Sequence, residues 1–337
     1  MVRLLWTASI LVVLVLAGCE SDLARRVSAY EKTRDYDAAK ALLERTVQQQ
    51  PRNAEAQYHL GRLHLRDGNY EAGRAALVAS QEASPQFAER SEFLLEKYMR
   101  QEMAAGKQAF EGGQLDSAIQ HFRWATQIQP AAPATHRAFG HALVEAGQAT
   151  AAESAYRQAL SLDSENVETL NNLAELTFRR GAYPKTVEYS LRALEGQDVP
   201  PQAVVERLAY AYVALGEFAN AEPQFERTLT LTDDLQVRTD YALVLFNQAK
   251  YQAARPRLEA LTQQAQPAPK LVRALAETYY ALQRYTESIT WYERLLERVP
   301  DDRDALQNLA IAYERTEQFE RAQAYREQLR RLGDTSE

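Results

Sequence analysis

Apolar residues in the segment 54–87 recur at the spacing of two amphipathic helices. Leu60 and Leu63 lie on one helical face, and a second set follows a tight turn at Gly68. Pro85 ends the second set, because proline has no backbone N–H to donate and its ring clashes with the preceding turn of a helix. One helical pair of this kind cannot bury its apolar faces alone, so the segment predicts stacked copies of itself.

Matching turns recur along the chain. The steps between them are 33 to 35 residues, except for a step of 45 residues from Gly68 to Gly113. The predicted turn positions are Arg34, Gly68, Gly113, Gly147, Gly181, Gly216, Ala249, Gln283 and Glu317. A small residue precedes each of the turns from Gly68 onward, where it would let the paired helices approach closely. These small residues are Gly61, Gly106, Gly140, Ala174, Ala209, Ala242, Ala276 and Ala310.

The period, with small and aromatic residues at set offsets, resembles the tetratricopeptide repeat family. The resemblance covers nearly everything after Cys19. It implies an all-α fold, a right-handed superhelical solenoid of about nine helix–turn–helix repeats with a concave groove. A fold of this kind does not by itself imply a function.

The 45-residue step inserts the segment 88–98 between the second and third pairs. Phe93, Leu94 and Tyr98 are helically spaced within it, so we expect a lengthened first helix in the third pair. The predicted organisation is a signal peptide at 1–18, an N-terminal repeat pair at 19–87, an inserted helical extension at 88–98 and a C-terminal array at 99–337.

The N-terminus has the layout of a secretory signal. Arg3 precedes an apolar run at 4–17, which is shorter than the roughly 18–20 residues of a membrane-spanning helix. Leu16-Ala17-Gly18-Cys19 resembles the lipobox of bacterial lipoproteins, which implies cleavage before Cys19 and its acylation, a stable membrane anchor. In that family an aspartate directly after the cysteine signals retention in the inner membrane. This chain has Glu20 at that position, which favours the periplasmic face of the outer membrane. An uncleaved anchor is the alternative.

Charge and composition argue against several other classes of function. The net charge of −7, with both signs interspersed, does not suit a nucleic-acid binder. His59 and His64, like His136 and His141, are five residues apart, which turns each pair away from a shared metal ion. No phosphate-binding glycine loop or Gly-x-Ser-x-Gly motif is present. We therefore expect no enzyme activity, no metal and no cofactor.

A binding surface is the remaining candidate. The family resemblance implies a groove lined by the outward face of each first helix, suited to a protein partner or an extended peptide. The predicted lining residues are Tyr58, Arg62, Arg66, Lys107, Phe110, Arg137, His141, Asn171, Glu175, Phe178, Glu206, Tyr210, Phe246, Arg273 and Tyr280. The charged lining residues of the second to fourth pairs are mainly basic, and the fifth and sixth pairs add Glu175 and Glu206. The alternative is an ordinary solvated helix face.

The two resemblances together imply a scaffold lipoprotein. Such proteins hold the components of a bacterial envelope machine for pilus assembly, secretion or exopolysaccharide export, and Cys19 would tether this one to the membrane. A periplasmic chaperone-like binder of unfolded or secreted polypeptides is the alternative. The sequence does not choose among the machines.

Overall fold

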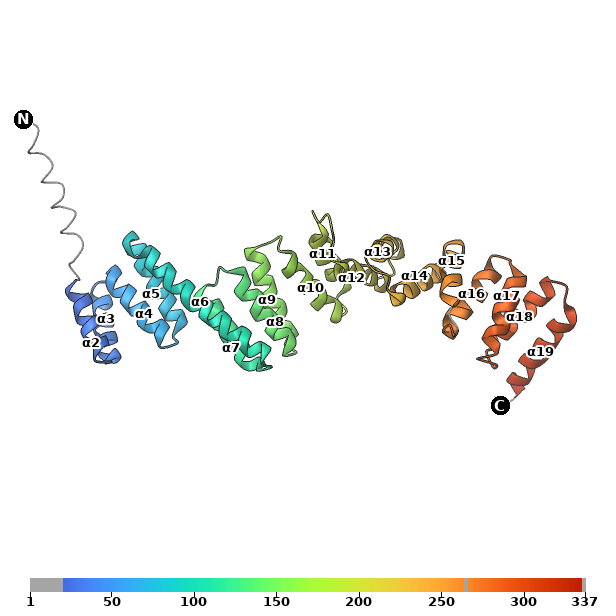
Figure 1. Ribbon diagram of the computed structural model, residues 1–337, viewed down its shortest axis with the longest axis horizontal. Helices are drawn as coiled ribbons and strands as arrows, with labels where there is room; N and C mark the ends of the chain where they lie inside the picture. The colour runs from blue at the N-terminus through green and yellow to red at the C-terminus, as the bar shows by residue number, and fades with distance from the viewer. Residues whose placement is uncertain (1–20, 264–265, 335–337) are drawn as a thin grey trace, which may run out of the picture. The chain divides into compact units, whose positions relative to one another are not determined.

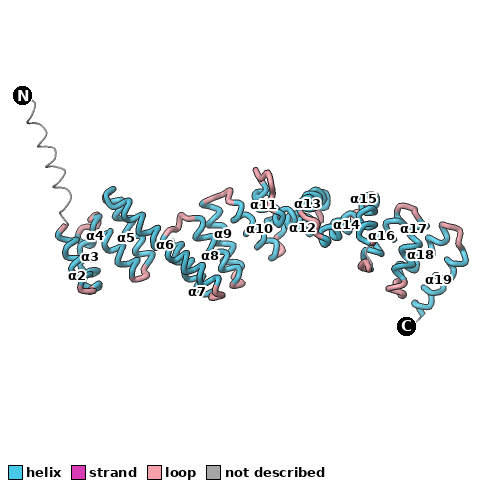
Figure 2. Tube along the Cα trace, in the orientation of Figure 1, coloured by secondary structure: helices cyan, strands magenta, loops and turns pink. Residues whose placement is uncertain are grey.

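The protein is described here by a computed structural model that covers residues 21–263 and 266–334. These residues form helices and no strand (Figure 2). Cys19 and the predicted signal at 1–18 lie outside the described residues.

The helices follow one another in pairs, labelled in Figure 1. The pairs are α2 (Asp22–Lys32) with α3 (Tyr36–Gln49), α4 (Ala54–Arg66) with α5 (Tyr70–Ala83), α6 (Ala88–Glu111) with α7 (Leu115–Ile128), α8 (Pro133–Glu145) with α9 (Ala149–Leu162), α10 (Val167–Arg179) with α11 (Tyr183–Leu194), α12 (Gln202–Ala214) with α13 (Phe218–Leu231), α14 (Leu235–Asn247) with α15 (Tyr251–Thr262), α16 (Pro269–Ala281) with α17 (Tyr285–Leu296), and α18 (Arg303–Arg315) with α19 (Phe319–Asp334). A short 3₁₀ helix, η1 (Pro85–Phe87), precedes α6. The predicted all-helical repeat architecture is confirmed. The earlier helix of each pair is called its first helix below.

The turns within the pairs lie at the predicted positions. All nine predicted turn residues have a positive φ, from 55° at Ala249 to 77° at Gly68. At Gly68 the N–H donates to the Leu65 carbonyl (3.2 Å), and the next N–H, of Asn69, donates to the His64 carbonyl (2.9 Å). These two bonds satisfy carbonyls that the end of α4 would leave unpaired. The left-handed residue therefore ends the first helix and starts the return of the chain.

Small residues before the turns allow close helix contact, as predicted. A Cβ atom placed on Gly140 would lie 2.7 Å from the ring of Tyr156, and one placed on Gly61 would lie 2.7 Å from Cγ of Leu77. Real Cβ atoms essentially never come so close to a neighbour. In the pairs that hold Gly61, Gly106 or Gly140, the second helix thus fills the space that the glycine leaves open.

The inserted segment is helical and continuous with the first helix of its pair. The helix α6 has 24 residues and begins at Ala88. Its inner side joins Tyr70 of α5 through Glu102, whose carboxylate accepts the Tyr70 hydroxyl at 2.5 Å. The other oxygen of Glu102 lies 2.6 Å from Nδ1 of His121 in α7. This buried carboxylate therefore ties α5, α6 and α7 together.

The chain separates into two compact units, Met1–Thr169 and Leu170–Glu337. In the first unit, one apolar cluster surrounds Leu43 and Leu60, and another surrounds Leu77 and Ile128. The second unit has its own clusters, one around Phe225, Tyr241 and Leu258 and one around Tyr292 and Tyr313. The predicted extension at 88–98 lies inside the first unit. No helix among residues 21–263 and 266–334 is long and apolar enough to cross a membrane.

Candidate partner-binding site

The predicted groove residues all lie on first helices, from α4 to α16. None of them is fully buried, because the core of each repeat is filled by other positions on the same helices. In α4, for example, Leu60 and Leu63 are buried while Tyr58 and Arg62 keep part of their surface accessible. The predicted residues therefore share an accessible helix face within each unit.

In the first unit, charged members of this face are engaged by carboxylates of the neighbouring repeat. Nη2 of Arg62 lies 2.5 Å from Oε1 of Glu31 in α2, and Nε of Arg137 lies 3.0 Å from Oε2 of Glu168. Pairs that water still reaches contribute little to stability because water screens them. They nevertheless neutralise the two arginines that were expected to make this face basic.

The other cations of the first unit's face also have close anions. Arg66 is 2.6 Å from Oδ1 of Asp67, and its guanidinium stacks on the Tyr36 ring at 3.3 Å. Lys107 is 3.7 Å from Oε1 of Glu111, one helical turn along α6. The predicted basic character of these pairs is therefore largely compensated within the chain.

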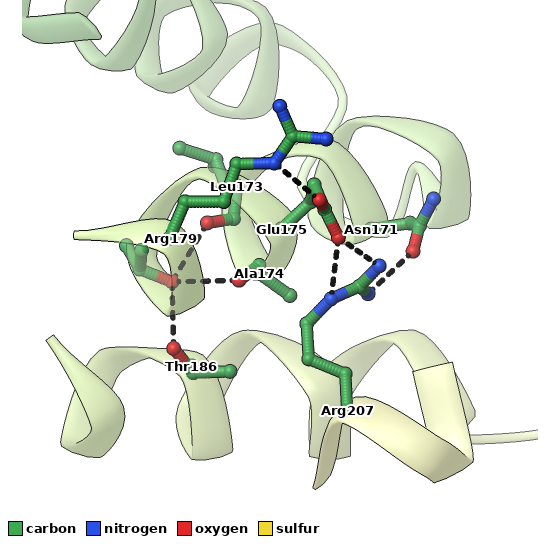
Figure 3. Close-up of polar contacts among 8 residues, drawn as sticks. Asn171, Leu173, Ala174, Glu175, Arg179, Thr186 and Arg207 are labelled. Carbon is green, nitrogen blue, oxygen red and sulfur yellow. Dashed lines mark hydrogen bonds and ion pairs between the residues drawn. The ribbon is translucent and has the colours of Figure 1, made fainter. Parts of the chain in front are cut away.

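In the second unit, Arg207 joins two predicted residues (Figure 3). From α12 it donates through Nε to Oε2 of Glu175 (2.8 Å) and through Nη1 to Oδ1 of Asn171 (2.9 Å), both on α10. Oε1 of Glu175 accepts from Nε of Arg179 at 2.6 Å. Burial alone would raise the pKa of Glu175, but the two guanidinium groups outweigh it and hold that pKa below its usual range. Glu175 is therefore a fixed anion.

Two further links join consecutive first helices in the second unit. The Tyr210 hydroxyl donates to Oδ2 of Asp240 at 2.9 Å, and burial together with this carboxylate raises the pKa of Tyr210. Arg273 binds both oxygens of Asp302, with Nη1 3.1 Å from Oδ1. Asp302 also caps α18 by accepting the Ala305 N–H at 3.1 Å. Arg273 thus helps to fix the start of α18, which is the first helix of the last pair.

Aromatic members of the face pack against the start of their own second helix. The ring centroids of Phe178 and Tyr183 are 5.7 Å apart, and those of Tyr280 and Tyr285 are 5.6 Å apart. Phe246 meets the aromatic residue at the start of α15 in the same way, at 6.0 Å. In the first unit Phe110 instead packs on the ring of His141, at 5.0 Å. These rings are held in place by contacts within the chain.

The links between first helices were missed by the sequence interpretation. Glu31, Asp240 and Asp302 were not among the predicted residues, nor was Arg207. The missed signal is a spacing of 29 to 32 residues between opposite charges or between a tyrosine and a carboxylate. This spacing is slightly shorter than one repeat, so it places the two partners on neighbouring first helices or, for Asp302, at the cap of the next one.

A metal centre does not emerge from the side chains that the structure describes. Within that part of the chain, no group of three or more histidine, cysteine, aspartate or glutamate residues is arranged to hold an ion.

Comparison with known proteins places the fold in a family. The model of the tetratricopeptide repeat matches residues 25–86, 137–202 and 239–303, which together make up more than half of the chain. The chain belongs to the tetratricopeptide repeat family. The turn and small-residue positions described above are thus those of tetratricopeptide repeats.

Two relatives share part of this tetratricopeptide array. The type IV pilus assembly protein PilF of Pseudomonas aeruginosa is 26% identical over 153 residues, covering 45% of this chain and 61% of the relative. Cellulose synthase operon protein C of Xanthomonas axonopodis pv. citri is 25% identical over 232 residues, covering 66% of this chain and 15% of the relative. The chain therefore spans less than two thirds of either relative.

A solved structure of Pseudomonas aeruginosa pilF is also similar. It has a TM-score of 0.44 and 20% sequence identity, and the match covers 61% of this chain and 94% of that structure.

Proposed function

We propose that this tetratricopeptide protein is a non-catalytic scaffold lipoprotein that holds protein partners during assembly of a bacterial envelope machine. The observation that carries the proposal is the accessible face of polar and aromatic side chains on successive first helices. Tetratricopeptide folds typically bind proteins and do not catalyse reactions, and a relative named for pilus assembly and one named for a cellulose synthase operon support an envelope setting.

In this proposal, acylated Cys19 anchors the chain to the periplasmic face of the outer membrane, after removal of residues 1–18. The pair at 19–87 lies next to the anchor, the extension at 88–98 follows, and the array at 99–337 supplies most of the binding face. The tether raises the local concentration of whatever partner is held. No nucleic acid or cofactor takes part.

Palmitate labelling tests the anchor. Labelled palmitate should enter the wild-type chain and not a Cys19→Ser variant, because the thiol is the acylation site of a lipobox. Labelling that persists in Cys19→Ser would refute the lipoprotein assignment and favour the uncleaved anchor.

Affinity capture from cell envelopes tests the scaffold. One or two stoichiometric envelope proteins are expected, whereas a broad spread of unfolded or secreted clients would favour the chaperone-like alternative. Capture should be weakened by Lys107→Glu with His141→Glu, since both side chains are exposed on the proposed face. A matched pair, Arg45→Glu with Arg52→Glu, lies off the first helices and should leave capture unchanged.

Arg62 and Arg137 are less suitable for this test. Their partners Glu31 and Glu168 lie on neighbouring helices, so replacement would break links between helices, whereas the partner of Lys107, Glu111, is exposed on the same helix. Unchanged capture by the Lys107 and His141 variant, with wild-type helicity, would show that the binding face lies elsewhere.

A further inference from the structure

The inserted segment exposes a large aromatic side chain. Phe93 on α6 is 64% exposed, although Leu95 on the same helix is buried. The repeat itself gives no reason for this residue, because it lies in the segment that breaks the regular period. An aromatic ring kept at the surface is a typical anchor of a protein interface.

Phe93 lies in an open hollow of about 670 Å³ on the first unit. Tyr58 of α4 lines the same hollow, and its ring packs against Phe87 with centroids 5.3 Å apart. The ring of His59 also meets the Tyr58 ring edge-on, with centroids 5.4 Å apart. The aromatic wall is therefore pre-formed, which lowers the entropic cost of binding.

The charged residues of the hollow are mostly acidic. Glu89, Glu92 and Glu96 line it together with a single cation, Arg90. Glu96 is paired with Arg100 at 2.5 Å, whereas neither Glu89 nor Glu92 has an ion-pair partner among the residues that the structure describes.

The nearest predicted basic residue does not offset this acidity. Arg62, one turn from Tyr58 on α4, is already engaged by Glu31. The hollow is therefore acidic, although the predicted groove residues of the second to fourth pairs are mainly basic.

We propose that this hollow docks a basic amphipathic segment of a partner protein, rich in lysine or arginine. Its aliphatic side chains and the stems of its basic residues would cover Phe93 and Tyr58, and its cationic groups would pair with Glu89 and Glu92. A guanidinium or ammonium group over the exposed ring adds a cation–π contact. The inference rests on the proposed scaffold function and names the chemistry of one partner.

Fluorescence anisotropy with the full chain tests the site. The probe is a labelled amphipathic helical peptide of lysine, leucine and alanine, and the comparison is the same peptide with every lysine replaced by glutamate. The lysine peptide should bind, the glutamate peptide should not, and rising salt should weaken binding because water-exposed ion pairs are screened.

Variants locate the binding. Phe93→Ala should weaken it by about tenfold or more, as expected for an interface anchor. Glu89→Gln with Glu92→Gln should weaken it and flatten its salt dependence. Phe319→Ala is the matched control, because Phe319 is 66% exposed on α19, in the other unit, and its removal should change nothing. Helical circular dichroism of each variant confirms that it is folded.

Three results would overturn the proposal: equal binding of both peptides, unchanged binding by Phe93→Ala, or self-association of the wild type that Phe93→Ala abolishes, which would make a second copy the occupant. Loss of the peptide site with intact capture of envelope partners would leave the scaffold function standing. Peptide binding in a chain that is neither acylated nor bound to envelope proteins would refute the scaffold function and leave the peptide site standing.

Discussion

The two units bring their paired helices together with different small residues. In the first unit the contact positions before the turns are Gly61, Gly106 and Gly140, and large side chains of the second helices occupy the space beside them. In the second unit the corresponding positions hold buried alanines, including Ala209, Ala242 and Ala276. The same repeat thus tolerates a methyl group in one unit and excludes it in the other.

The units also differ in how their charged links are exposed. The side chains of Arg62 and Glu31 in the first unit are 34% and 23% exposed, whereas those of Arg207 and Glu175 in the second unit are 9% and 35% exposed, so the difference lies in the burial of the guanidinium. All five histidines lie in the first unit and none in the second. The stability of the second unit should therefore depend more on the buried guanidinium of Arg207. The stability of the first unit should depend more on pH, because that unit holds the histidines.

The largest difference should come from Arg207. Arg207→Met is expected to cost about 2 to 3 kcal/mol, because a guanidinium that is 9% exposed loses its hydrogen bonds to Glu175 and Asn171, although Glu175 keeps Arg179. Arg62→Met, the matched change in the first unit, should cost about 1 kcal/mol or less, since water reaches the Arg62 side chain, which is 34% exposed. Hydrogen exchange resolved by unit measures both. Equal losses would show that exposure does not govern these links.

Gly140→Ala should cost about 2 kcal/mol, despite the helix propensity that alanine adds. The new methyl group would meet the ring of Tyr156, which is 1% exposed and has no room to move. Ala276→Gly in the second unit should cost only about 1 kcal/mol, because it removes a methyl group and adds backbone freedom. Urea unfolding measures both. Stabilisation by Gly140→Ala would mean that the helices of this pair can separate easily.

Acidification from pH 7 to 5 should weaken the first unit more than the second. Burial, aided by Arg62 near His59 and Lys40 near His64, lowers the pKa of both histidines. The unfolded chain then binds more protons, so this contribution is fully present above the unfolded pKa of about 6.5 and is lost as the pH falls through the folded value.

Tryptophan fluorescence separates the units in this experiment. Trp124 reports the first unit and Trp291 the second, when each is kept as the single tryptophan by Trp→Phe changes elsewhere. His59→Gln with His64→Gln should reduce the pH dependence of the urea midpoint reported by Trp124. Equal shifts at both reporters would contradict the assignment to these histidines.

The smallest effects should come from the turns. Ala249 has a φ of 55°, which costs a residue with a Cβ about 1 kcal/mol, so Ala249→Gly should stabilise the second unit by up to that amount. Gly147, at 73°, is the reverse case, and Gly147→Ala should destabilise the first unit by a similar amount. Thermal unfolding measures both, and two changes of the same sign would show that the turn conformation is not the cause.

Much of the fold could be predicted because it is set by local rules. A left-handed residue ends a helix wherever the chain must return, so the turn positions from Arg34 to Glu317 were found from the period alone. The helical state of 88–98 followed from the spacing of Phe93, Leu94 and Tyr98. These features depend on residues close together in the chain.

The candidate site was harder to predict because it depends on pairs of helices. The accessible positions on first helices follow from the repeat pattern, but the partners of Arg62 and Arg273 lie on neighbouring helices whose relative rotation the pattern does not specify. The acidity beside Tyr58 depends on the phase of α6 against α4 in the same way. The acidic residues there, Glu89 and Glu92, lie in the inserted segment and were not among the predicted groove residues.

The length of α6 has a consequence for how such a protein can change over time. A helix of 24 residues is about 36 Å long, and its added turns bury Leu95 in one apolar cluster with Ile128 of α7 while they expose Phe93. The turn at Gly113 keeps the geometry of the other turns. Exposed residues at 88–98 can therefore be exchanged while buried ones such as Leu95 keep the later repeats in register, which lets new binding preferences evolve on an unchanged framework.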